Sequence, residues 1–305
     1  MSPTNHGDPT ITPVRASDDD LRYGFRSSVR AFVDRVRGGD LGSLPVVAGL
    51  VIIWAIFQVL NPNFLSSQNL VNLTMQSAAV GTIAIGIVLV LLIGEIDLSV
   101  GSVSGLSAAI LAVLFVQVGW PLPLVLLVAI AAAAVIGLFY GLLYTKFGVP
   151  SFVITLAGLL AILGLQLWVL GKFGSINIPY DSWISEFGTQ MFLPPWLSYV
   201  VIAVVVGAYA WQLVAQARRR TDAGLEAMSY NVIGIRVGAL LLVLGVTAWY
   251  LNLSRGVGMM FLFFLLLVTL MHFVLTRTRW GRSVYAVGGS VEAARRAGEN
   301  DFRHG

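Results

Sequence analysis

Two acidic side chains, Glu95 and Asp97, lie between apolar runs that are long enough to cross a membrane. The stretch around them reads "LVLLIGEIDLSVGSVSG", so glycine and serine residues follow the acids directly. Carboxylates are costly inside a bilayer, and those that occur there commonly mark the pathway of a solute or an ion. We therefore treat this stretch as a candidate polar lining, with binding of protons or cations as the alternative chemistry.

Helix geometry decides whether both acids can serve one cavity. Residues two positions apart point about 200° apart on an α-helix, so a regular helix cannot turn both carboxylates to one side. Gly94 precedes them, and Asp97 is a residue type that favours the N-cap of a new helix. The pattern predicts a broken helix near residues 94–98. An ordinary cytoplasmic turn between two spans, with both acids in water, fits the residues equally well.

The elements that must position these acids are apolar helices. The chain of 305 residues is 57% hydrophobic and only 11% charged, against about 25% charged in a soluble domain. This composition predicts an all-α, polytopic membrane protein with about eight transmembrane helices. The predicted spans cover residues 44–60, 76–93, 99–118, 122–144, 150–171, 195–215, 238–253 and 257–276. Gly101 and Gly105 form a G-x-x-x-G pair, which predicts a close helix neighbour.

Positive charge predicts the orientation of the spans. If the spans alternate and the amino terminus is cytoplasmic, all of the 19 Lys and Arg residues except Lys172 and Arg255 lie on the cytoplasmic side. Both termini are then cytoplasmic, and the net charge of +4 reflects topology rather than binding of nucleic acid. On the opposite side, the segment 172–194 predicts a short surface helix with aromatic anchors.

The chain divides into four predicted regions. Residues 1–16 are expected to be a disordered cytoplasmic tail, and residues 17–43 an amphipathic interfacial helix with a basic face. A solvated charged tail is the alternative for the second region. Residues 44–276 form the transmembrane domain, and residues 277–305 a cytoplasmic loop. The sequence has no Cys, no metal-ligand spacing among its three His and no P-loop pattern, so we expect no metal, no cofactor and no ATP hydrolysis by this chain.

Three stretches in order resemble one known family. "GEIDLSVGSVSGLSAAI" resembles a G-G-I-D-L-S-V-G-S motif, "KFGVPSFVITLAGLLAILGL" (146–165) a V-P-x-F-I-x-T-L segment, and "TRWGRSVYAVGGSVEAARRAG" (278–298) a G-R-x-x-Y-A-V-G-G cytoplasmic loop. These are motifs of the permease subunits of bacterial ABC sugar importers, the ribose/xylose/arabinose/galactose permease family. Glu95 stands where the second Gly of the first motif is usual, which resembles the xylose-type branch.

The resemblance implies a membrane-spanning permease for a monosaccharide, with xylose or a similar pentose favoured, in a bacterial plasma membrane. It implies a cytoplasmic ABC ATPase, an extracytoplasmic sugar-binding protein and a second permease subunit (a homodimer) as partners within the lipid bilayer. The substrate-pathway residues that it suggests are Glu95, Asp97, Ser99, Ser102, Phe152 and Thr155. The ATPase-coupling residues that it suggests are Gly281, Arg282, Tyr285, Gly288, Gly289, Glu292 and Arg295.

Two features of the coupling loop carry expectations of their own. Gly288 and Gly289 precede "SVEAARRAG", which predicts a glycine turn, with φ > 0 at Gly288, before a short helix capped by Ser290. A solvated basic tail that binds lipid head groups is the alternative for residues 278–298. In the family, further spans follow this loop, whereas here "ENDFRHG" follows Gly298, so we expect a truncated chain.

Three functions therefore remain open from the sequence. The first is the permease subunit of an ATP-driven importer. The second is a secondary transporter or channel in which Glu95 and Asp97 bind protons or cations, although no span contains a basic partner for them. The third is a non-transporting remnant.

Overall fold

The computed structural model describes residues 44–224 and 228–289, and in that part every regular element is helical. Seven helices are long and apolar enough to cross a membrane. They are α3 (Ser67–Leu92), α4 (Val100–Ala112) with its π-helical continuation Val113–Gln117, α5 (Leu122–Phe147), α6 (Ser151–Leu170), α8 (Pro195–Asp222), α9 (Tyr230–Asn252) and α10 (Met259–Arg277). An eighth apolar helix, α2 (Leu44–Leu60), has 17 residues, the lower limit for a span. The predicted all-α membrane fold of about eight spans is confirmed.

The chain divides into two units, which we describe separately. The first holds α2 and most of α8 and α9, and the second holds the remaining helices with the adjoining ends of α8 and α9. The predicted tail 1–16 and interfacial helix 17–43 lie outside the described residues. In the first unit, the ring of Phe64 folds back after α2 and stacks on Phe57, with 5.3 Å between ring centroids.

Helices α4, α5 and α6 pack against one another in the second unit. Gly105 makes room for a side chain of α6, because a Cβ at this position would meet the amide group of Gln166 at 2.4 Å. At Gly101, the other glycine of the G-x-x-x-G pair, no described residue lies within 4 Å of a Cβ built there. The predicted close neighbour of α4 is therefore α6, and one of the two glycines makes the contact.

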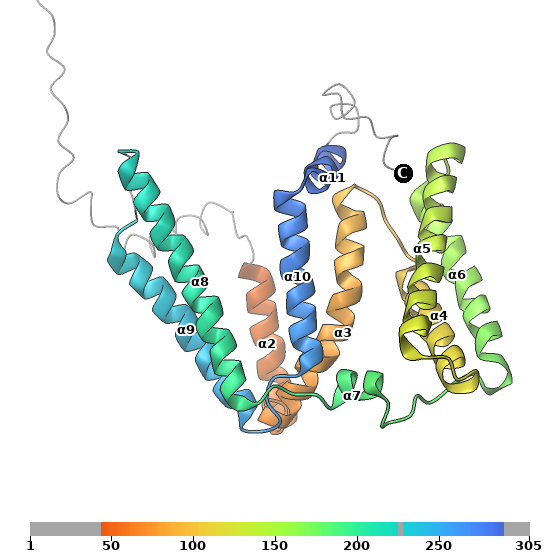
Figure 1. Ribbon diagram of the computed structural model, residues 1–305, viewed down its shortest axis with the longest axis horizontal. Coiled ribbons are helices and arrows are strands. Elements are labelled where there is room, and N and C mark those ends of the chain that lie inside the picture. Colours follow the sequence, from red (N-terminus) through yellow and green to blue (C-terminus); the bar gives the residue numbers. More distant parts are fainter. Residues whose placement is uncertain (1–43, 225–227, 290–305) are drawn as a thin grey trace, which may run out of the picture. The chain divides into compact units, whose positions relative to one another are not determined.

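Helix α10 lies beside α3, and the short helix α11 (Arg279–Gly289) contacts both (Figure 1). Glycines again permit the approach. A Cβ at Gly81 of α3 would meet the ring of Phe264 at 2.6 Å, and a Cβ at Gly258, just before α10, would meet the sulfur of Met75 at 2.0 Å. Small residues thus set the spacing of this helix pair as well.

Helix α3 begins nine residues before the predicted span of 76–93. Ser66 caps it by accepting a hydrogen bond from the amide of Asn69 at 3.3 Å. The first turns contain Asn and Gln side chains, which lower the hydropathy of the segment without opposing a helix. The apolar pattern therefore identified the membrane-facing part of the helix and missed its polar start.

The predicted short helix in the segment 172–194 is α7 (Trp183–Thr189). Trp183 stacks on Phe187 at 5.2 Å, and Phe187 meets the edge of Phe263 of α10 at 5.9 Å. Backbone bonds then tie the chain after α7 to the start of α10, from the Leu193 amide to the Val257 carbonyl and from the Met259 amide to the Met191 carbonyl. The short helix is therefore fixed to the bundle by its aromatic side chains.

Orientation in the membrane can be tested by cysteine labelling, since the chain has no native Cys. Asp181 and Arg219 are both exposed. If the positive charges are cytoplasmic, Asp181→Cys should react with a membrane-impermeant maleimide in intact cells. Arg219→Cys should react only after the cells are permeabilised. The reverse pattern of labelling would contradict the predicted orientation.

Candidate substrate-pathway site

The helix that precedes the two acids ends in a way that only glycine allows. Gly94 has φ of +85°, which is unfavourable for residues with a side chain. The amide of Gly94 donates to the carbonyl of Leu91, and the amide of Glu95 donates to the carbonyl of Val90. This pair of bonds is the Schellman pattern, which satisfies two of the free carbonyls at the end of α3. The predicted break near residues 94–98 is confirmed, and it spans the residues between Leu92 and Val100.

Glu95 joins the break to the connection between α5 and α6. Its Oε1 accepts a hydrogen bond from the hydroxyl of Tyr144 at 2.6 Å, and its Oε2 accepts one from the hydroxyl of Ser151. Tyr144 lies in the last turn of α5, and Ser151 is the first residue of α6. Hydrogen bonds to a carboxylate are stronger than those between neutral groups. One side chain therefore holds three segments of chain together.

Asp97 supports the start of α4 from two residues before its N-cap. Its Oδ1 accepts hydrogen bonds from the amide and the hydroxyl of Ser99, at 2.7 and 2.8 Å. We expected Asp97 itself to be the N-cap, but the cap is Ser99, whose own side chain makes no capping bond. The carbonyl of Ser99 also accepts the first backbone hydrogen bond of α4, which comes from the amide of Val103. The aspartate thus satisfies a free amide without occupying the capping position.

Ser99 and Ser102 form the buried side of this turn. Ser99 is fully buried, and the hydroxyl of Ser102 donates to its carbonyl at 2.8 Å. Ser102 is 8% exposed. The two hydroxyls therefore form hydrogen bonds to groups of the turn itself, the Asp97 carboxylate and the Ser99 carbonyl, and do not face a cavity. This explains the run of small polar residues after the acids.

The broken segment runs alongside α6, in the same direction. Glu95 pairs with Ser151, the carbonyl of Ile96 accepts from the hydroxyl of Thr155 at 3.3 Å, and Gly105 lies against Gln166. Successive partners thus lie progressively further along α6, and Thr155 is one helical turn, about 6 Å, beyond Ser151. The segment begins level with the start of α6 and runs along it by one helical turn before α4 starts. Of the two readings left open by the sequence, a break within the bundle fits this register.

A cavity of about 270 Å³ lies between this segment and helices α5 and α6. Of the residues predicted for the pathway, Glu95, Asp97 and Thr155 line it. Ser99 and Ser102 lie in the turn behind it, and Phe152, 53% exposed, is not in its wall. The sequence reading missed the polar side chains that complete the wall, which are Tyr140, Tyr144 and Ser151.

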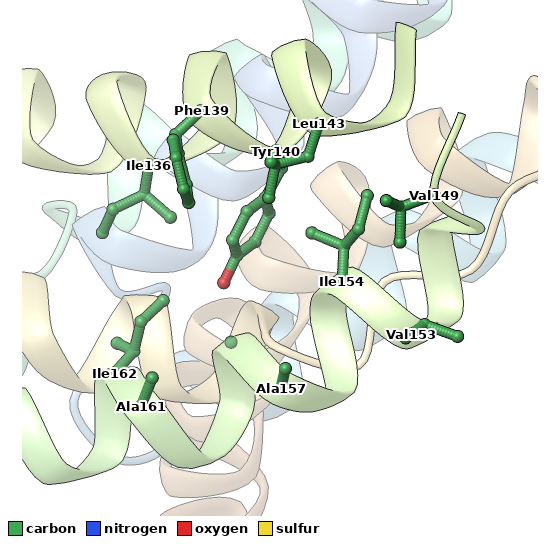
Figure 2. Close-up of a pocket in the computed structure, with 11 residues that line it drawn as sticks. Ile136, Phe139, Tyr140, Leu143, Val149, Val153, Ile154, Ala157, Ala161 and Ile162 are labelled. Carbon is green, nitrogen blue, oxygen red and sulfur yellow. The ribbon is translucent and has the colours of Figure 1, made fainter. Parts of the chain in front are cut away.

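Tyr140 lines this cavity and also an apolar groove of about 400 Å³ between α5 and α6 (Figure 2). Its side chain points from α5 across to α6, where it reaches the backbone at Gly158. The hydroxyl is buried and has no hydrogen-bond partner among the described residues. A buried hydroxyl without a partner costs about 1–3 kcal/mol, so its position needs an explanation.

The predicted coupling segment is helical from its start, which differs from the expected glycine turn. Thr278 ends α10, and its Oγ1 accepts from the amide of Gly281 at 3.1 Å, which caps α11. Gly288 has no positive φ and lies inside α11. A Cβ there would meet the carbonyl oxygen of Leu92 at 1.8 Å, so this glycine is required for close packing rather than for a turn.

The other predicted coupling residues divide by exposure. Gly281 is buried against the backbone of Leu275, whereas Arg282 and Tyr285 are exposed on α11. Gly289 ends the helix, and no described residue lies within 4 Å of a Cβ built there. Ser290, Glu292 and Arg295 lie outside the described residues. Helix α11 therefore packs its small residues on α3 and α10 and leaves a basic and an aromatic side chain free on its surface.

Comparison with known proteins agrees with this geometry. The family described as "Branched-chain amino acid transport system / permease component" matches residues 69–304. The chain belongs to this permease family. The xylose transport system permease protein of Escherichia coli K12 is 37% identical over 238 residues, 78% of this chain and 60% of that protein. The resemblance to xylose-type permeases is thereby confirmed.

Two further relatives extend the comparison. The xylose permease of Haemophilus influenzae is 32% identical over 258 residues, 84% of this chain and 68% of that protein. The ribose import permease of the same organism is 30% identical over 207 residues, 62% of this chain and 61% of that protein. No solved structure matches the chain. The match to the Escherichia coli relative spans 60% of that protein's length, and the described part of this multi-pass membrane permease contains seven long apolar helices.

The bond between Asp97 and Ser99 can be tested in this permease by two substitutions of similar size. Asp97→Asn keeps the Oδ1 acceptor and should leave thermal unfolding in detergent close to wild type. Asp97→Leu removes the acceptor of the Ser99 amide and should cost about 1 kcal/mol, which is similar to the cost of losing a capping side chain that satisfies a free amide at the start of a helix. Equal unfolding temperatures for Asp97→Leu and wild type would show that the carboxylate does not support the start of α4.

Proposed function

We propose that this chain is the membrane-spanning subunit of an ATP-driven importer for a monosaccharide, with xylose or a similar pentose favoured. The observation that carries the proposal is the pairing of 37% identity to a xylose permease with a mainly apolar cavity whose lining residues include two acids, Glu95 and Asp97, and four residues with hydroxyl groups. Such groups form hydrogen bonds with the hydroxyls of a sugar. The relative named for ribose supports the same substrate class.

The charges around the cavity favour a neutral solute over an amino acid. No Lys, Arg or His is among the described residues that line it. An amino acid carries an ammonium group, which Glu95 and Asp97 would attract, and a carboxylate, which would find no cationic partner among these residues and would be repelled by the two acids. A sugar brings only hydroxyl groups, which can donate to carboxylates. The family description mentions amino acids, but this wall suits a polyhydroxy solute better.

The partners that we propose follow from the same assignment. A separate cytoplasmic ABC ATPase would supply the energy, an extracytoplasmic binding protein would deliver the sugar, and a second copy of the permease would complete the pathway. Both termini would be cytoplasmic, in a bacterial plasma membrane. The pathway residues would be Glu95, Asp97 and Thr155 in the wall, with Ser99 and Ser102 supporting them and Phe152 nearby on α6.

Helix α11 supplies a physical route from the ATPase to this site. We assign contact with the ATPase to the exposed side chains Arg282 and Tyr285, and to Glu292 and Arg295 beyond the described residues. Gly281, Gly288 and Gly289 would allow close approach. Gly288 touches the carbonyl of Leu92, the last residue of α3, and the break begins at once after it. A displacement of α11 would therefore act directly on the segment that carries Glu95.

Uptake measurements test the proposed function. The chain would be reconstituted in vesicles with a cognate ATPase and binding protein, and uptake of labelled xylose, ribose and leucine would be measured. We expect pentose uptake only when ATP and both partners are present, and no leucine uptake. Pentose or cation uptake by the chain alone, without ATP, would contradict the importer and favour a secondary transporter.

The packing of α11 gives a second test with a matched control. Gly288→Val places a side chain against the Leu92 carbonyl, whereas Gly289→Val enters open space. We expect Gly288→Val to lower thermal stability and to reduce the amount of ATPase that co-purifies, with membrane insertion unchanged. Gly289→Val should keep wild-type thermal stability. Equal stability and equal ATPase recovery for Gly288→Val and wild type would contradict a role of this contact in coupling.

A further inference from the structure

The two acids of the break differ in how many of their oxygen atoms already accept hydrogen bonds. Both oxygens of Glu95 are used, Oε1 by the hydroxyl of Tyr144 and Oε2 by the hydroxyl of Ser151. In Asp97, only Oδ1 accepts hydrogen bonds from described residues, and both come from Ser99, at 2.7 and 2.8 Å. Asp97 is therefore the acid that keeps an oxygen atom, Oδ2, for a further partner.

The Oδ2 atom of Asp97 is accessible. In the described part of the chain, the fully buried side-chain atoms that lack a hydrogen-bond partner are the Tyr140 hydroxyl and Oδ1 of Asn252. Oδ2 of Asp97 has no partner among the described residues and is not one of these buried atoms, so part of its surface is open. Ser99, which holds the opposite oxygen, is fully buried in the turn behind. Oδ2 therefore lies on the open side of the carboxylate.

Asp97 lines two neighbouring cavities. One is the cavity of about 270 Å³ against α5 and α6, and the other, of about 230 Å³, lies between α3, α4 and α5. In the smaller cavity, every other described lining residue is aliphatic or glycine except Tyr140, whose oxygen is buried. Asp97 is thus the charged residue that both cavities share, and the side chain that offers hydrogen bonding to the smaller one.

A carboxylate oxygen in a mainly apolar wall requires a hydrogen-bond donor, because an ionised group away from bulk water is costly unless it is paired. No Lys, Arg or His is among the described residues that line either cavity. A neutral polyhydroxy solute brings hydroxyl donors, and hydrogen bonds to an ionised acceptor are the stronger kind. Glu95 can bond to such a solute only if Tyr144 or Ser151 gives up its bond, whereas Oδ2 of Asp97 requires no exchange.

We propose that Asp97 is the specificity-determining acid of the permease, whose Oδ2 accepts a hydrogen bond from one hydroxyl of the solute, and that Glu95 has a structural role. The proposal rests on the proposed function and deepens it, because it gives different tasks to two acids in one wall. Glu95 holds the broken segment against the connection between α5 and α6. This attachment keeps Asp97, two residues later, beside both cavities.

An isosteric substitution tests the contact with the solute. The importer is assembled with its ATPase and binding protein in vesicles, and ATP-driven uptake is measured for D-xylose and its 2-, 3- and 4-deoxy analogues at concentrations that saturate the binding protein. In Asp97→Asn, the retained oxygen still accepts from Ser99, and an NH₂ group that only donates replaces Oδ2. We expect xylose uptake to fall about ten- to hundredfold, the effect of losing one hydrogen bond to a charged group. For the deoxy analogue that lacks the bonded hydroxyl, wild type and Asp97→Asn should transport at similar rates.

Glu95→Gln is the matched comparison, since it also replaces a carboxylate by an amide. One of the two hydroxyls that donate to Glu95 would then face an NH₂ group, so we expect a lower unfolding temperature and an equal fractional loss of uptake for xylose and all three analogues. Ser151→Ala should cost less stability in the Glu95→Gln background than in wild type, because the bond is already weakened. Asp181→Asn, at an exposed acid that lines neither cavity, should behave as wild type in every assay.

The outcomes distinguish this assignment from the proposed function. If wild type shows no ATP-driven uptake of any pentose, the proposed function fails, and the assignment of Asp97 fails with it. If wild type transports xylose and Asp97→Asn transports it equally well, only the assignment is overturned. An equal fractional loss for xylose and all three analogues in Asp97→Asn, or an analogue-selective loss in Glu95→Gln, would overturn it too. A selective loss in Asp97→Asn alone supports it.

Discussion

Backbone hydrogen bonding at the break between α3 and α4 is the constraint on which the site depends. Lipid offers no hydrogen-bond partners, so an interrupted helix is tolerated only where protein groups satisfy its free amides and carbonyls. Here three devices do so, namely the Schellman bonds after Gly94, the Thr155 hydroxyl on the Ile96 carbonyl, and the Asp97 carboxylate on the Ser99 amide. Two of the polar residues that line the cavity, Asp97 and Thr155, are thus residues that the break itself requires.

The stability of the bundle and its proposed function depend on the same side chains. Glu95 lines the cavity, and the same carboxylate ties the end of α5 and the start of α6 to the break. A solute that bonds to Glu95 would compete with Tyr144 and Ser151 for its oxygens. Binding would then loosen the contact between α5, α6 and the segment after α3. A contact of α11 with Leu92 reaches the same segment from the other side, so solute and ATPase would act on one short piece of backbone.

The spans and the break could be predicted from the sequence because each has a characteristic order of residue types along the chain. Apolar length marks the helices, and a glycine followed by acids and serines marks the interruption. Finer placements depended on three-dimensional neighbours. Asp97 was assigned the N-cap on propensity, but the backbone placed the cap at Ser99. Gly288 was predicted for its φ angle, whereas its lack of a side chain is what the Leu92 carbonyl requires. Tyr140 left no signal, because a tyrosine within an apolar helix is indistinguishable in sequence from a lipid-facing anchor.

Glycines on facing helices explain why the role of Tyr140 could not be predicted from the sequence. Gly81 and Gly105 each admit a larger side chain from the neighbouring helix, Phe264 and Gln166 respectively, and in a bilayer such close packing supplies much of the association between helices. Gly158 follows the same rule but admits a tyrosine, so the packing contact also brings a polar atom into the interior. At Gly81, the contact involves only hydrocarbon and is complete once it forms. At Gly158, the same close approach buries a hydroxyl that has no partner among the described residues, so this packing contact carries a cost that the contact at Gly81 does not.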